Sequence, residues 1–199
     1  TGVGPYAGYG VDSGDYNTFL GNRSGWGNSS SGGTGSFNIA SGYASMCCWQ
    51  GASHNIVFGY AAACCITSGG ENVIIGRQAG EKIGSAGCNV LFGYASAQCI
   101  DTGTHNVTAG TYAGKRITTG TGNIYMGYQS GPQNADSSAG CNIVMGWDSG
   151  DAITSGGSNV IFGKDAGRCL TTAGSNVYIG TNAGCRDDDG GYHVFIGSS

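Results

Sequence analysis

The sequence repeats itself every seventeen residues. A pentad of asparagine, valine or isoleucine, a variable residue, a large apolar residue and glycine recurs along the chain, as in NIVFG, NVIIG and NVYIG. Most copies are seventeen residues apart, one interval is nineteen and one is twenty-one. A unit this short cannot bury an apolar face alone, so the period predicts an architecture in which each copy packs on its neighbours.

Two positions of the unit hold almost the same residue throughout. With the asparagine as position one, position five is always glycine, which would break a helix in every copy, whereas the β-branched pentad between turn residues is typical of a short strand. The predicted unit is strand, tight corner, second short strand and turn. The corner glycines include Gly42, Gly59, Gly76, Gly93, Gly110, Gly127, Gly146, Gly163, Gly180 and Gly197.

Stacked units would set the asparagines above one another, where side-chain amides can form a hydrogen-bonded ladder. A residue used identically in so many copies indicates a scaffold role and not a catalytic one. The predicted ladder consists of Asn38, Asn55, Asn72, Asn89, Asn106, Asn123, Asn142, Asn159 and Asn176.

These patterns predict an all-β fold, a parallel β-solenoid or β-roll of about eleven 17-residue repeats, as one repeat domain over residues 1–199. The copy at 17–37 is longer and irregular, a two-residue insertion falls near 132–138, and the pattern is cut mid-repeat at both ends. With rungs about 4.8 Å apart, eleven coils form an elongated rod of roughly 50 Å.

Position three raises the question of oligomeric state. Side chains alternate along a strand, so position three points away from positions two and four, yet it is apolar too. A long apolar ridge usually marks an interface. We therefore expect this stripe to pack on sister chains in a homotrimer; the alternative is a wider single-chain coil with both faces internal. The stripe is Val57, Ile74, Leu91, Tyr125, Val144, Ile161, Tyr178 and Phe195.

Composition excludes several classes of protein. The chain has 41 glycines and two prolines without a three-residue period, which excludes collagen, and its net charge of −4 includes no basic cluster. Nucleic acid is therefore not an expected partner. No apolar run reaches the roughly twenty residues that span a bilayer, so membrane insertion is not expected either.

Nine cysteines favour an oxidising, extracellular setting, although cysteine can also serve as a small buried apolar residue. Cys47 and Cys64, and likewise Cys48 and Cys65, are one period apart, so stacking would bring each pair within disulfide range. We predict the disulfides Cys47–Cys64 and Cys48–Cys65. Zinc is disfavoured because no C-x-x-C or cysteine–histidine spacing occurs.

No catalytic motif is present, so the sequence predicts neither an enzyme nor a cofactor; a coupled acid–base pair in a cleft would reopen that question. Three N-x-S/T triplets are candidate glycosylation sites in a secretory setting, at Asn22, Asn28 and Asn106.

The unit N-[VI]-x-[IF]-G-x-x-A-G with a following I-T-[ST]-G turn resembles repeats of phage tail-fibre and tail-spike-like proteins over essentially the whole chain. It is also similar to the head repeats of trimeric autotransporter adhesins, and that resemblance implies a parallel β-roll in a homotrimer. Two features depart from the pattern: the adhesin repeat is shorter than seventeen, and nine cysteines are unusual in either family.

The leading hypothesis is a structural segment of an extracellular, cell-surface or virion fibre, the shaft of a trimeric fibre or adhesin. A second hypothesis is a subunit that polymerises end to end through free strand edges. A third is an ice- or glycan-binding solenoid, with surface glycans as partners. It rests on the position-thirteen threonines Thr67, Thr118, Thr154 and Thr171, a row that Gly84, Asp101 and Asp188 interrupt.

Overall fold

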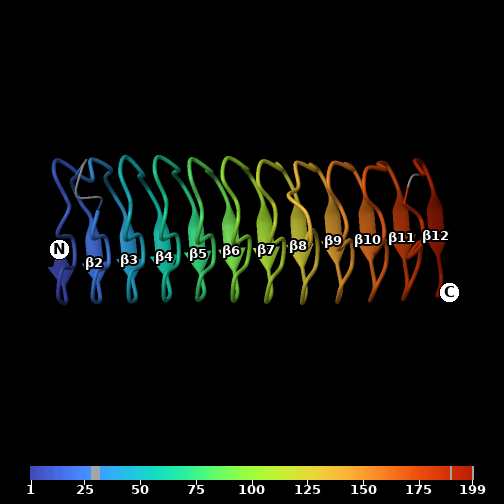
Figure 1. Cartoon of the computed structure of the whole chain (residues 1–199), viewed down its shortest axis with the longest axis horizontal. Coiled ribbons are helices and arrows are strands. Elements are labelled where there is room, and N and C mark those ends of the chain that lie inside the picture. Colours follow the sequence, from blue (N-terminus) through green and yellow to red (C-terminus); the bar gives the residue numbers. More distant parts are fainter. Residues whose placement is uncertain (28–31, 189, 199) are drawn as a thin grey trace.

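The computed structural model describes residues 1–27, 32–188 and 190–198, and these form a β-solenoid of about eleven turns without a helix. Twelve short strands lie side by side in chain order along one rod, with the two ends of the chain at opposite ends of it (Figure 1). The strands are β1 Gly2–Val3, β2 Thr18–Leu20, β3 Ile39–Ser41, β4 Ile56–Phe58, β5 Val73–Ile75, β6 Val90–Phe92, β7 Val107–Ala109, β8 Ile124–Met126, β9 Ile143–Met145, β10 Val160–Phe162, β11 Val177–Ile179 and β12 Val194–Ile196.

Every neighbouring pair of strands is parallel and in register with the repeat, so each residue lies beside its equivalent in the next coil. Val73 pairs with Val90, for example, and Ile74 with Leu91. The predicted fold class is confirmed: one parallel sheet wound as a solenoid of 17-residue repeats.

Each strand is short because the backbone turns sharply at both of its ends. The residue before the asparagine has a positive φ, such as 57° at Cys88, and the position-five glycine that follows the strand has φ between 120° and 149°. A Cβ on Gly93 would lie 2.5 Å from the carbonyl oxygen of Gly110. Glycine is therefore required both by its dihedral angle and by the close approach of the next coil.

Among the described residues, the predicted second strand of each repeat is not formed. Positions seven and nine both have positive φ, for example 51° at Ala61 and 47° at Ala63, and this left-handed backbone interrupts an extended segment. The segment still bonds to the next coil, since the amide of Cys48 donates to the carbonyl of Cys64 at 2.8 Å. The other side of the rod is thus a column of turns, with isolated bridges at Val11–Gly33 and Ile117–Ser137.

The core runs along the axis of a single chain. Position three, the small residues of position eight and the aliphatic residues of position twelve all point inward, as shown by the complete burial of Ile74, Ala79 and Ile83. The prediction of position three as an interface stripe is therefore wrong. Val57, Ile74, Leu91, Tyr125, Val144, Ile161 and Tyr178 are buried inside the coil, and Phe195 is half-exposed only because it lies in the last coil.

Side-chain size is balanced between neighbouring coils. Where position three is the small Ala40, the indole of Trp49 at position twelve fills the space and packs on Phe19, with ring centroids 5.4 Å apart. At Thr108, a buried polar residue of the same stripe, the hydroxyl meets that of Ser96 at 2.5 Å. One chain therefore closes its own core, and a trimer is not needed to complete it.

Candidate functional site: the outer face of the sheet

The predicted asparagine ladder is present, and it occupies one inner corner of the coil. Asn89 shows the pattern: its Nδ2 donates to Oδ1 of Asn72 at 3.1 Å and to the carbonyl of Gly103 at 2.9 Å. Its own Oδ1 accepts from both the backbone amide and Nδ2 of Asn106, at 2.9 and 3.1 Å. Both donors and both acceptor positions of the amide are used, so no group remains to bind a ligand.

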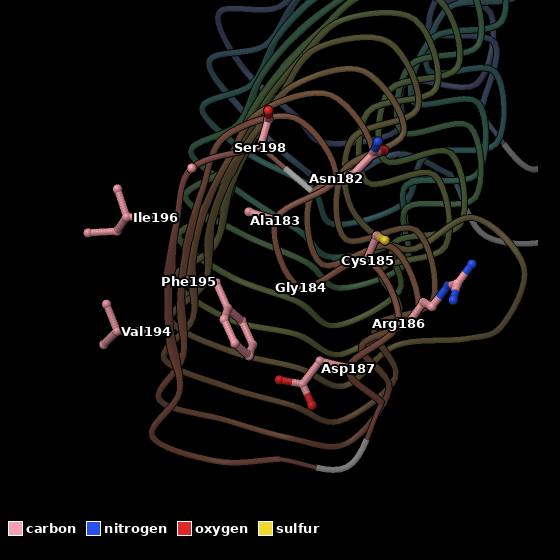
Figure 2. Close-up of a pocket in the computed structure, with 11 residues that line it drawn as sticks. Asn182, Ala183, Gly184, Cys185, Arg186, Asp187, Val194, Phe195, Ile196 and Ser198 are labelled. Carbon is pink, nitrogen blue, oxygen red and sulfur yellow. The ribbon is translucent and has the colours of Figure 1, made fainter.

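The outer face of the sheet is formed by positions two and four, which sequence reasoning assigned to the interior. Figure 2 shows the alternation in the last coil, where Phe195 points into the lumen and Val194 and Ile196 point out. Along the rod, Val90 is 43% exposed and Phe92 57%. Position two is valine or isoleucine from β3 to β12, and position four is mostly large and apolar.

This face, which we call the outer apolar face, carries no charged residue at position two or four from β2 to β12. Ten inter-strand steps of about 4.8 Å give it a length of roughly 50 Å, and three-residue strands make it roughly 10 Å wide. An area on the order of 500 Å² lies at the upper end of what monomeric soluble proteins expose. Its extent and lack of charge are typical of an interaction surface.

A row of aromatic side chains borders the outer apolar face at position six, directly after the corner glycine. Tyr43 and Tyr60 stack with centroids 5.2 Å apart and planes 13° apart. The guanidinium of Arg77 lies 5.5 Å from the rings of both Tyr60 and Tyr94. Farther along the rod, Tyr128 packs on Trp147 at 4.8 Å. These rings contact one another from coil to coil, and Tyr60 and Trp147 remain half-exposed.

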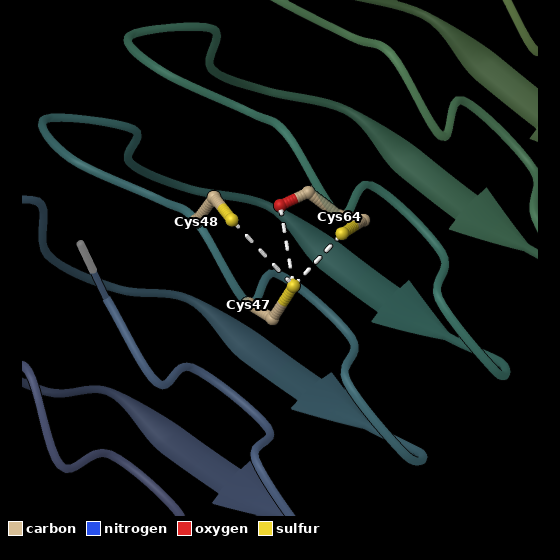
Figure 3. A group of neighbouring side chains, drawn as sticks. All are labelled: Cys47, Cys48 and Cys64. Carbon is tan, nitrogen blue, oxygen red and sulfur yellow. Dashed lines mark hydrogen bonds between the residues drawn. The ribbon is translucent and has the colours of Figure 1, made fainter.

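The predicted disulfide partners Cys47 and Cys64 meet as free thiols on the turn side of the rod, beside Cys48 (Figure 3). The Sγ atoms of Cys47 and Cys64 lie 2.8 Å apart, and those of Cys47 and Cys48 lie 3.7 Å apart. No disulfide is formed at these distances, so both pairings stay predictions. The hydrogen bond with Cys47 and partial burial together raise the pKa of Cys64, and burial raises the pKa values of Cys48 and Cys65.

An open pocket of about 800 Å³ lies at the end of the rod that carries β12 (Figure 2). Asp187 lies there between two donors: the Tyr178 hydroxyl donates to its Oδ2 at 2.5 Å, and Nδ1 of His193 is 2.6 Å from the same oxygen. Burial acts to raise the pKa of Asp187, but the hydrogen bonds from His193 and Tyr178 outweigh it and hold the pKa below its ordinary value. A carboxylate beside an imidazole could take part in acid–base chemistry, and here the same carboxylate also accepts the hydroxyl of the core residue Tyr178.

The three glycosylation candidates differ in accessibility. Asn22 is exposed at position six, and Asn28 lies outside the described residues. Glycosylation at Asn106 is a wrong prediction, because this side chain is a fully buried member of the ladder and donates to the carbonyl of Gly120 at 2.8 Å. A glycan there would require the coil to open.

Comparisons with models of protein families, with curated proteins and with solved structures found no match for this chain. Within the described residues, no helix is long and apolar enough to cross a membrane. Function must therefore be argued from the geometry alone.

Proposed function

We propose that the chain is a rigid structural segment of an extracellular or virion fibre, and that copies of it associate through the outer apolar face. The observation that carries the proposal is this uncharged face, which follows the whole length of the rod from β2 to β12. A second copy is the occupant that fits best. Its sheet has the same spacing of about 4.8 Å between rungs, so rows of side chains can interdigitate along the full length, as in packed sheets about 10 Å apart.

The area supports a pair or a small bundle. Two copies would bury on the order of 1,000 Å² together, which is the lower limit for a specific interface, and the aromatic row at position six would widen the contact. A flat face is fully covered by one sister face, whereas the trimer implied by the family resemblance would bring three such faces round an axis. Both arrangements use the same residues.

The rest of the rod also fits a structural role. The polar side chains that recur at position one are used internally, since the ladder amides bind the backbone and one another. The glycines at position five from Gly4 to Gly180 approach the next coil too closely for any side chain. A solenoid of this kind offers few loops to proteases, as a shaft in an extracellular setting requires.

Mass in solution, measured by light scattering after gel filtration, tests the proposal. We expect a particle of at least twice 19.9 kDa, and we expect F58K/F92K, which places two lysines on the outer apolar face, to be a monomer. Burying those charges in an apolar contact costs several kcal/mol. The matched control S68K/T102K places two lysines two coils apart on the turn side and should keep the mass of the wild type. A wild type that remains at 19.9 kDa overturns lateral association.

An end-to-end filament is the second candidate, and one feature favours it. In a stack that continued the register of the repeat, Thr1–Val3 of one copy would lie beside Val194–Ile196 of the next. The half-exposed ring of Phe195 would then face Gly2, which has no side chain to compete for the space. Particles that lengthen with protein concentration in electron micrographs would support this candidate.

The ice- or glycan-binding hypothesis receives less support from the threonine row. The hydroxyls of Thr118, Thr154 and Thr171 donate to the backbone carbonyls of Ser137, Thr171 and Asp188 in the next coil. These three hydroxyls are therefore engaged within the rod and do not form a free array.

A further inference from the structure

A cluster of sulfur atoms lies on the turn side of the rod, away from the outer apolar face. Cys47 and Cys48 come from one coil, and Cys64 and Cys65 come from the next, at the same two repeat positions. The Sγ atoms of Cys47, Cys48 and Cys64 all lie within 4.8 Å of one another (Figure 3). The thiol of Cys65 interacts with those of Cys64 and Cys48. Three sulfurs from two coils thus converge on one small region, and Cys65, which follows Cys64 in the sequence, lies beside this group but outside it.

The backbone holds this arrangement in place. The amide of Cys48 donates to the carbonyl of Cys64 at 2.8 Å, and the amide of Cys65 donates to that of Glu81 in the following coil at 3.1 Å. Neighbouring positions along one coil and equivalent positions in the next therefore place all four cysteines on the same part of the rod. The half-buried Cys47 and Cys64 lie beside the exposed Cys48 and Cys65, so an ion can reach the sulfurs from solvent.

The distances suit a tetrahedral metal site. Zinc–sulfur bonds of about 2.3 Å at tetrahedral angles place ligand sulfurs about 3.8 Å apart. Cys47 and Cys48 already have this separation, at 3.7 Å. The 2.8 Å between Cys47 and Cys64 must open by about 1 Å, which rotation of half-exposed side chains can supply.

We propose that Cys47, Cys48 and Cys64 bind one thiophilic d10 cation of the Zn²⁺ type, that the exposed side chain of Cys65 rotates to supply the fourth thiolate, and that the ion joins two neighbouring coils. Thiolate sulfur selects such ions over hard cations such as Mg²⁺ and Ca²⁺. The four thiols release four protons to solvent when the ion binds, and no electron is transferred. The site deepens the structural role without depending on it, because a metal that binds only the folded rod stabilises it.

Oxidation and metal binding compete for the same sulfurs. A disulfide between Cys47 and Cys64 would remove two of the four ligands, so the proposed site belongs to the reduced protein. Disulfide formation requires an oxidant, whereas metal binding requires reduced thiols, so an experiment on the reduced protein tests metal binding alone.

The test is a titration of the reduced full chain with Co²⁺ under nitrogen, after the reductant has been removed. We expect the visible absorption of tetrahedral, thiolate-bound Co²⁺ to saturate at one equivalent per chain and to disappear when Zn²⁺ is added. With Zn²⁺ bound, four of the nine thiols should become slow to react with a thiol reagent. The variant C47S/C64S should lose the signal.

The control C88S/C141S also removes two cysteines, both exposed and outside the cluster, and should bind as the wild type does. Far-UV circular dichroism of both variants shows whether the solenoid has folded. Absence of the thiolate bands in the wild type, or equal loss of them in the two variants, overturns the proposal.

Discussion

At the scale of single residues, the asparagine at position one connects each coil to both of its neighbours. Its amide is planar and carries two donors and an oxygen with two acceptor sites, and the coil corner needs all four. Asn89 binds Asn72 on one side, Asn106 on the other and the carbonyl of Gly103. Aspartate has the same shape as asparagine but lacks its two donors. Replacing Asn89 by aspartate therefore tests the hydrogen bonds without changing the shape of the side chain.

We expect N89D to lower the free energy of unfolding by about 3 kcal/mol or more. A carboxylate there would face two oxygens, Oδ1 of Asn72 and the carbonyl of Gly103, and each of these buried acceptors would lose one donor, although the backbone amide of residue 89 would still donate to Asn72. Each unsatisfied buried group costs roughly 1–3 kcal/mol. Urea unfolding followed by circular dichroism measures the change.

The exposed Asn22 provides the control, since N22D makes the same chemical change in contact with water. It should unfold within about 0.5 kcal/mol of the wild type. Equal unfolding midpoints for N89D and N22D would show that the ladder does not stabilise the rod.

At the scale of elements, the sequence predicts the strands and their stacking but not which face of each strand is the inner one. The pentad and its glycine locate every strand, and alternation separates position three from positions two and four. All three positions are apolar, however, so hydrophobicity could not choose between them. A usable signal lies in size: position three varies from Ala40 to Tyr178 with compensating neighbours such as Trp49, as a closed core demands, whereas position two is almost uniformly valine or isoleucine.

The candidate sites were predictable to different degrees. The period of seventeen brings Cys47 to Cys64, but only the structure shows that Cys48 lies within reach of both. Sequon spacing cannot reveal that the Asn106 amide is committed to the ladder. The prediction of a second strand was wrong because residues such as Ala61 and Gln78 adopt left-handed backbone angles there. Neither is glycine, so the sequence does not indicate these angles.

The last coil should be sensitive to pH through Asp187. Because its folded pKa lies below the ordinary value of 3.8, the charged carboxylate adds stability above that value, and the contribution is lost as the pH falls through the folded pKa. D187N should therefore be less stable than the wild type at neutral pH, by about 1 kcal/mol for a single carboxylate whose partner His193 is half-exposed. The gap should close well below pH 3.8.

Thermal melting of both proteins at the two pH values gives this comparison. The neighbouring D188N replaces an exposed carboxylate of the same turn and should match the wild type throughout. A gap between D187N and the wild type that does not change with pH would assign the effect to packing and not to the charge of Asp187.

At the scale of the whole molecule, the rod is a one-dimensional stack in which each coil contacts its two neighbours. Stability in such a stack is approximately a sum of coil and interface terms. What the stack cannot tolerate is a loss of register, since a shift of one residue turns every side chain of a strand to the other face. The nineteen-residue interval between Asn123 and Asn142 shows where extra residues are accepted: the turn near 132–138 absorbs them, and Asn142 still donates to Asn123 at 3.2 Å.

Deletion of one entire repeat, residues 89–105, should therefore leave a folded rod. Cys88 would be joined to Asn106, which occupies the same repeat position as Asn89, so the ladder would continue from Asn72 to Asn106. Deletion of 89–106 removes one residue more, brings Thr108 out of the core and breaks the ladder at the junction. We expect the first variant to keep the circular dichroism spectrum and to shorten by about 4.8 Å in small-angle scattering. The second should lose cooperative melting or aggregate, and equal behaviour of the two would mean that register with the repeat does not determine the fold.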